Sequence, residues 1–132
     1  MPNYEGRITG WAVGDDLLIR RTIDRTESNL PNGVVVTDAW FTVKAAIADL
    51  DAAAVVDKQT TTTDAPGIGQ VEDDGGGDVD PIIRFDLTDA DTRAIGTLHR
   101  KYDIQVKVTG GAIYTGEKGE IWGEGDVTLD IT

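Results

Sequence analysis

The chain has 132 residues, a formal net charge of −12 from 24 acidic against 12 basic side chains, 39% hydrophobic residues and no cysteine. This length suits one domain, and the missing cysteine excludes disulfides, thiolate metal sites and cysteine nucleophiles. So acidic a chain, with no basic stripe in its sequence, is a poor partner for nucleic acid or for an anionic membrane surface.

The first segment, residues 1–14, is interpreted as an N-terminal arm that precedes a single domain over residues 15–132. The arm is short, punctuated by glycine, and carries Tyr4 and Trp11. It lacks the basic start and the apolar centre of a signal peptide, and no apolar run in the chain reaches the ~20 residues that span a bilayer. We therefore expect a protein that is made in a cytoplasm and stays soluble, with an arm that docks on a neighbour.

Alternating apolar and polar residues predict β-strands along most of the domain. In each such segment the apolar side chains share one parity, which is typical of a strand with one buried and one wet face. Arg21 interrupts the first of them, which predicts an edge strand or a side chain that reaches past the core to solvent. A more polar, β-branched run adds a further strand. The predicted strands cover residues 17–23, 39–47, 55–63, 83–87, 102–108 and 127–131.

Turns and two short helical segments separate these strands. Residues 48–54 are rich in alanine, and residues 88–95 begin with an N-cap type threonine and end before Gly96. The Gly-Gly pair at 110–111 predicts a hairpin that leads into the last strands. Seven or eight short strands between such turns indicate an all-β, antiparallel sandwich. Its predicted interior contains Phe41, Val43, Phe85, Leu87, Ile104 and Val106.

The middle third of the chain concentrates the acidity. Residues 49–91 contain 12 acidic side chains against only Lys58 and Arg84, and residues 71–80 combine acids with three consecutive glycines. Such a loop could cage Ca²⁺, but its spacing does not fit the EF-hand pattern. Like charges around glycines favour a mobile, solvated loop, so no metal is predicted. The weaker alternative is a calcium site made of Asp73, Asp74, Asp78 and Asp80.

The side chains that usually carry catalysis are scarce. His99 is the only histidine and Ser28 the only serine, and neither lies in a nucleophile motif, so we expect no enzyme and no cofactor. Aromatic residues are enriched at protein interfaces, so the aromatic side chains are better candidates for interface anchors than for catalysis. Trp122 would point outward if the glycines after it keep the strand register, whereas a bulge there would bury it. The interface candidates are Tyr4, Trp11 and Trp122.

One passage of the chain resembles a known family. Residues 83–108 contain a strand, the motif Leu-Thr-x-x-Asp-Thr over Leu87–Thr92, and a second strand that begins Tyr-Asp-Ile-Gln-Val at Tyr102. The passage resembles the small immunoglobulin-like β-sandwich of tailed bacteriophages, typified by the N-terminal domain of the baseplate upper protein. A looser similarity extends over residues 15–132. The resemblance implies an immunoglobulin-like fold in a virion component without a catalytic site.

Two functions remain as expectations. The first is a non-enzymatic structural protein of a tailed-phage virion, made in the host cytoplasm: a capsid cement or decoration protein, or a baseplate or tail component. It would contact other virion proteins, such as the major capsid or baseplate and tail proteins, and copies of itself, through edge strands, loops and the arm. The second is a Ca²⁺-dependent carbohydrate-binding module that uses the loop 72–80 and an exposed tryptophan as a sugar platform.

Overall fold

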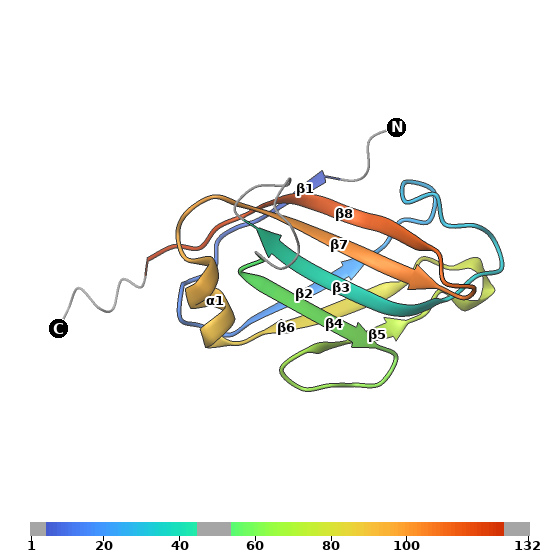
Figure 1. Cartoon of the computed structure of the whole chain (residues 1–132), viewed down its shortest axis with the longest axis horizontal. Coiled ribbons are helices and arrows are strands. Elements are labelled where there is room, and N and C mark those ends of the chain that lie inside the picture. The colour runs from blue at the N-terminus through green and yellow to red at the C-terminus, as the bar shows by residue number, and fades with distance from the viewer. Residues whose placement is uncertain (1–4, 45–53, 126–132) are drawn as a thin grey trace.

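The computed structural model describes residues 5–44 and 54–125, whose path is shown in Figure 1. This part of the chain forms eight strands, one α-helix and one short 3₁₀-helix. In chain order the elements are β1 (Glu5–Ile8), β2 (Leu17–Thr22), β3 (Val36–Lys44), β4 (Val56–Thr61), β5 (Gly69–Asp73), η2 (Gly76–Asp78), β6 (Ile82–Leu87), α1 (Asp89–Ile95), β7 (Arg100–Val108) and β8 (Ile113–Ile121).

The strands form two sheets. The larger sheet has five strands in the order β1-β8-β7-β3-β4, and the smaller has three in the order β2-β6-β5. β1 runs parallel to β8, and every other pairing between the described strands is antiparallel. The all-β prediction is therefore confirmed for the described residues. The strand predicted over 127–131 and most of the helical turn predicted over 48–54 lie outside them.

The apolar sides of the two sheets meet around three aromatic rings. The ring centroid of Phe41 on β3 lies 5.5 Å from that of Phe85 on β6 and 5.7 Å from that of Tyr102 on β7. Alternation produces this contact, because one parity of each strand faces inward. All six predicted core side chains are at most 2% exposed: Phe41, Val43, Phe85, Leu87, Ile104 and Val106.

Helix α1 joins the two sheets between β6 and β7, and the prediction over residues 88–95 is confirmed. Thr88 is the N-cap: its hydroxyl accepts from the Asp91 N–H, and the Asp91 carboxylate accepts from the Thr88 N–H at 2.8 Å. This capping box satisfies backbone donors that a helix start leaves open. The Asp91 carboxylate also lies 2.6 Å from Lys58 Nζ on β4, which ties the helix to the edge of the larger sheet. No helix in residues 5–44 or 54–125 is long and apolar enough to cross a membrane.

The predicted N-terminal arm is instead, in its described residues, part of the domain's own sheet. β1 pairs with β8 from Glu5↔Lys118 to Ile8↔Ile121, and the pairing resumes at a bridge between Ala12 and Glu124. Two glycines, Gly6 and Gly119, allow this close approach: a Cβ at position 119 would lie 1.9 Å from the Gly6 carbonyl oxygen. The boundary drawn at residue 14 is therefore not a boundary between an arm and a domain.

Candidate interaction site

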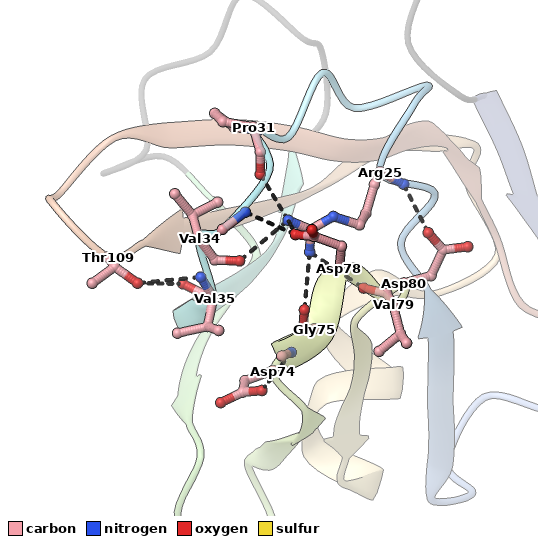
Figure 2. A network of polar contacts seen from close by, with 12 residues as sticks. Arg25, Pro31, Val34, Val35, Asp74, Gly75, Asp78, Val79, Asp80 and Thr109 are labelled. Atoms are coloured by element: carbon pink, nitrogen blue, oxygen red, sulfur yellow. Dashed lines mark hydrogen bonds and ion pairs between the residues drawn. The ribbon is translucent and has the colours of Figure 1, made fainter.

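A buried arginine organises the loops at one end of the molecule (Figure 2). Arg25 follows β2 and is 8% exposed. Its Nη1 donates to the carbonyl oxygens of Gly75 at 3.3 Å and Val79 at 3.2 Å. Its Nη2 donates to those of Pro31 at 2.7 Å and Val34 at 3.2 Å. One guanidinium group thus joins the loop between β2 and β3 to the loop between β5 and β6.

Two aspartates of the acidic loop complete this contact. Asp78 Oδ1 lies 3.5 Å from Arg25 Nη2 and accepts from the Gly33 N–H at 2.7 Å. Asp80 Oδ1 accepts from the backbone N–H of Arg25 at 3.1 Å. The loop predicted to be mobile and solvated is instead held in place by charge-assisted bonds to a residue about fifty positions earlier. A single buried cation opposes the repulsion between its carboxylates.

A third segment joins the same end of the fold. The backbone N–H of Thr109, beside the β7–β8 hairpin, donates to the Val35 carbonyl oxygen at 3.0 Å, and the Val35 N–H donates to Thr109 Oγ1 at 3.2 Å. We call the segments 24–35, 74–80 and 108–112 together the loop end. Figure 2 shows Thr109, Val35 and Arg25 in this arrangement. Three connections between different pairs of strands are thereby fixed relative to one another.

The four candidate calcium ligands do not converge on one point. Asp73 Oδ1 accepts from the Gly75 N–H and Asp74 Oδ1 from the Gly76 N–H, both at 2.9 Å. The other two candidates, Asp78 and Asp80, accept from the backbone and from Arg25 as described. Within residues 5–44 and 54–125 no group of three or more His, Cys, Asp or Glu is arranged to hold a metal ion. The carboxylates act as caps of local turns, which is a common role for aspartate.

Calcium removal is therefore expected to leave the melting temperature unchanged. The cation that contacts the acidic loop is the guanidinium of Arg25, and a chelator does not remove it. Differential scanning calorimetry of the full chain in EDTA and in millimolar CaCl₂ measures this directly. A fall of more than ~5 °C in EDTA would contradict the expectation, because such a shift corresponds to a free-energy change of about 1 kcal/mol in a domain of this size.

A second polar centre is buried between the sheets. Glu117 on β8 is 1% exposed and accepts a hydrogen bond from the hydroxyl of Tyr102. Arg21 Nε on β2 lies 3.1 Å from each of its carboxylate oxygens. Burial and the bond to Glu117 raise the pKa of Tyr102, so its hydroxyl stays protonated and donating. Burial lowers the pKa of Arg21, but the Glu117 carboxylate outweighs it and the net pKa is raised.

This centre explains the charged residue that interrupts the alternation of β2. Arg21 points between the sheets because a buried carboxylate there needs a partner, and β2 is an edge strand of its sheet, as predicted. An open cavity of about 380 Å³ adjoins the pair. Its lining combines one guanidinium with carboxylates and offers no serine, histidine or lysine: Arg21, Thr22, Asp24, Glu27, Asp80, Gly116 and Glu117.

The aromatic interface candidates have different positions. Trp11 is 7% exposed, and its Nε1 donates to the Ile8 carbonyl oxygen at 3.2 Å, so it is a core residue and not an exposed anchor. It is buried because Gly123 leaves room for its ring: a Cβ there would lie 2.6 Å from it. Trp122 is half-buried and stacks on exposed His99, with ring centroids 3.8 Å apart. Tyr4 lies outside the described residues.

Sequence reasoning missed the residues that organise both polar centres. Arg25 and Glu117 lie in segments without a motif, and each acts on residues far away in the chain. The sequence contained one weak signal for the second polar centre. Arg21 lies at a position where the alternation of the strand predicts an apolar side chain, and a buried arginine implies an acidic partner elsewhere in the chain. No protein-family model matches the chain, and a search of curated proteins finds no match either. Function has to be inferred from the residues and from their arrangement.

Proposed function

We propose that the chain is an immunoglobulin-like β-sandwich that serves as a non-enzymatic structural protein of a tailed-phage virion. It acts as a capsid cement or decoration protein, or as a baseplate or tail component. Its partners are other virion proteins, such as the major capsid or baseplate and tail proteins, and copies of itself.

The order of the strands supports the immunoglobulin-like fold. In a variable-type immunoglobulin domain one sheet contains strands B, E and D and the other contains G, F, C and C′. Here β2, β6 and β5 take the first set of positions, and β8, β7, β3 and β4 take the second. Phe41 is a buried aromatic residue at the position of strand C, where that fold has a tryptophan, whereas the Tyr102 hydroxyl donates to Glu117 and not to the backbone as the conserved tyrosine of strand F does.

The observation that carries the proposal is the role of the passage that resembles the phage family. Thr88 and Asp91 of its Leu-Thr-x-x-Asp-Thr motif form the capping box of α1. Thr92 is fully buried, and its hydroxyl donates to the Asp15 carbonyl oxygen at 2.9 Å. Tyr102 donates to the buried Glu117 carboxylate. Each of these residues thus has a structural contact within the fold, as expected of a motif that maintains the fold and carries no chemistry.

The loop end is the part of the fold best suited to contact a neighbour. Because Arg25 already orders these loops, docking costs less conformational entropy than it would for mobile loops. Two of the four edge strands in the described part of the chain, β2 and β4, are less suitable, since each places a charged side chain, Arg21 or Lys58, toward the interior. Inward charges of this kind oppose the pairing of edges. The contacts expected from β2, β4 and a free arm are therefore assigned to the loops and sheet faces.

The test is to look for the protein in purified particles. We expect quantitative mass spectrometry of virions to find it at a fixed copy number, and particles made without its gene to bind added full-length protein saturably. The Phe85→Ala variant, as an unfolding control, should bind poorly. If the protein is absent from virions and does not bind heads or tails, the virion proposal is wrong. No observation on the described residues favours the carbohydrate-binding alternative.

A further inference from the structure

A second surface, the outer face of the five-stranded sheet, lies opposite the core. It consists of the side chains that alternate with buried ones along the strands, and on β7 these are Lys101, Asp103, Gln105 and Lys107. Strand register aligns their neighbours: Trp40 lies between Gln105 and Gln59. The ion pair between Lys101 Nζ and Glu120 Oε2, at 3.0 Å, shows that neighbouring strands present these rows on one side.

The charge of this face differs from that of the chain as a whole. Four of the chain's five lysines lie on it, together with one arginine, while the described acidic side chains on it number four. Glu5 shares the parity of Arg7 and is in register with Lys118, so positive and negative positions on the face balance, although the whole chain has a charge of −12. The cations are Arg7, Lys44, Lys101, Lys107 and Lys118, and the anions are Asp38, Asp57, Asp103 and Glu120.

One row of residues across the face is uncharged and contains an aromatic ring. Half-buried Trp40 on β3 lies in register with Gln59 on β4 and Gln105 on β7, and Gln105 with Thr115 on β8. Figure 1 shows β3 and β7 in the middle of this sheet. An aromatic centre with a charged rim of both signs is the usual anatomy of a protein interface, where tryptophan is enriched among the residues that bind most strongly.

We propose that two copies of the chain associate through the outer faces of their five-stranded sheets. This inference rests on the proposed function only in its assumption that copies of the chain contact one another. Two molecules of charge −12 repel each other overall, and a face on which positive and negative residues balance adds little to that repulsion. A two-fold contact between identical patches is also the commonest form of self-association.

The size of the face limits the contact that it can make. Five strands at ~4.8 Å spacing and six residues at ~3.3 Å give a patch of about 20 Å by 20 Å. The pair would then bury on the order of 800–1,000 Å² in total, which is below the roughly 1,200 Å² of a stable, specific interface and in the range of weak, transient ones. We therefore expect a weak dimer, with a dissociation constant between about 10 µM and 1 mM. Such contacts become effective when many copies are held on one particle.

Analytical ultracentrifugation of the full chain from about 5 µM to 1 mM tests the contact. We expect the weight-average mass to rise from 14.1 kDa toward twice that value. A face variant, Gln105→Glu with Lys107→Glu, should weaken the dimer at least tenfold. The matched control, Arg20→Glu with Thr22→Glu, makes the same change in charge on exposed positions of β2 in the other sheet. It should alter the dissociation constant by less than about twofold to threefold.

NMR dilution of the wild-type protein gives a second reading that needs no variant. The side-chain amide signals of Gln59 and Gln105 should shift with concentration, and those of the loop end should not. A wild-type chain that stays monomeric at 1 mM would overturn the proposal. So would equal weakening by the control variant, or concentration-dependent shifts confined to other surfaces. None of these outcomes depends on binding to particles, so failure here and failure of the virion proposal are distinguishable.

Discussion

Replacing Phe85 by alanine is expected to lower the free energy of unfolding by about 3–5 kcal/mol. The ring is fully buried, and it is the contact of β6 with Phe41 across the core. Its removal leaves a cavity that the backbones of two sheets cannot close. Since a small domain has only about 5–15 kcal/mol of stability, the variant would lose a large part of it. Urea denaturation followed by tryptophan fluorescence measures the change in midpoint.

A matched control is Leu18→Ala, on the neighbouring strand of the same sheet. Leu18 is 61% exposed, so its truncation should change the free energy of unfolding by less than about 0.5–1 kcal/mol. If Phe85→Ala denatured at the same urea concentration as the wild type, the inward parity assigned to β6 would be wrong. Equal destabilisation by both changes would show that the smaller sheet has no preferred buried face.

The side of each strand that is buried could be predicted from the sequence, because the alternation of apolar and polar residues is a local property. In β6 and β7 every second residue is apolar, and the buried side is the one that the alternation indicates. The α1 helix was predictable for a similar reason, since Thr88 and Asp91 are only three residues apart. Such patterns need no knowledge of the partner strand.

The pairing of β1 could not be predicted in the same way. Its sequence, Glu5 to Ile8, shows no run of alternating apolar residues, and its partner β8 lies more than one hundred residues later. The decisive feature is that Gly6 and Gly119 meet, which is a property of the folded pair and of neither segment alone. The burial of Trp11 depends in the same way on the space left by Gly123.

The acidic loop was misread for a related reason. By composition it is typical of a mobile segment, and the prediction of mobility considered only charges within the loop. Asp78 and Asp80 are instead fixed by Arg25, which is about fifty residues away and carries no motif of its own. Composition predicts how a segment of this kind behaves on average. The order of this acidic loop depends instead on one buried cation, Arg25, which another loop supplies.

Replacing Arg25 by methionine is expected to lower the free energy of unfolding by about 3 kcal/mol and to release the loop end. Methionine keeps an unbranched, apolar stem but removes the donors to four carbonyl oxygens and to Asp78. Hydrogen bonds to charged groups contribute about 1.5–3 kcal/mol each, but their sum is an overestimate. Burying the guanidinium is itself costly, and among the described residues its Nε has no acceptor.

Hydrogen–deuterium exchange separates this effect from a general loss of stability. In Arg25→Met the amides of Gly33, Gly75 and Gly76 should exchange much faster than in the wild type, because Asp78 and the acidic loop lose their anchor. Amides in the centre of β7 should change only as far as global unfolding requires. Arg20→Met is the control, since its salt bridge to Glu72 is on the exposed face of the smaller sheet and its loss should leave the loop end protected. Unchanged protection of the loop end in Arg25→Met would show that the three loops hold one another without the guanidinium, and the preordered site assigned to them would then need another cause.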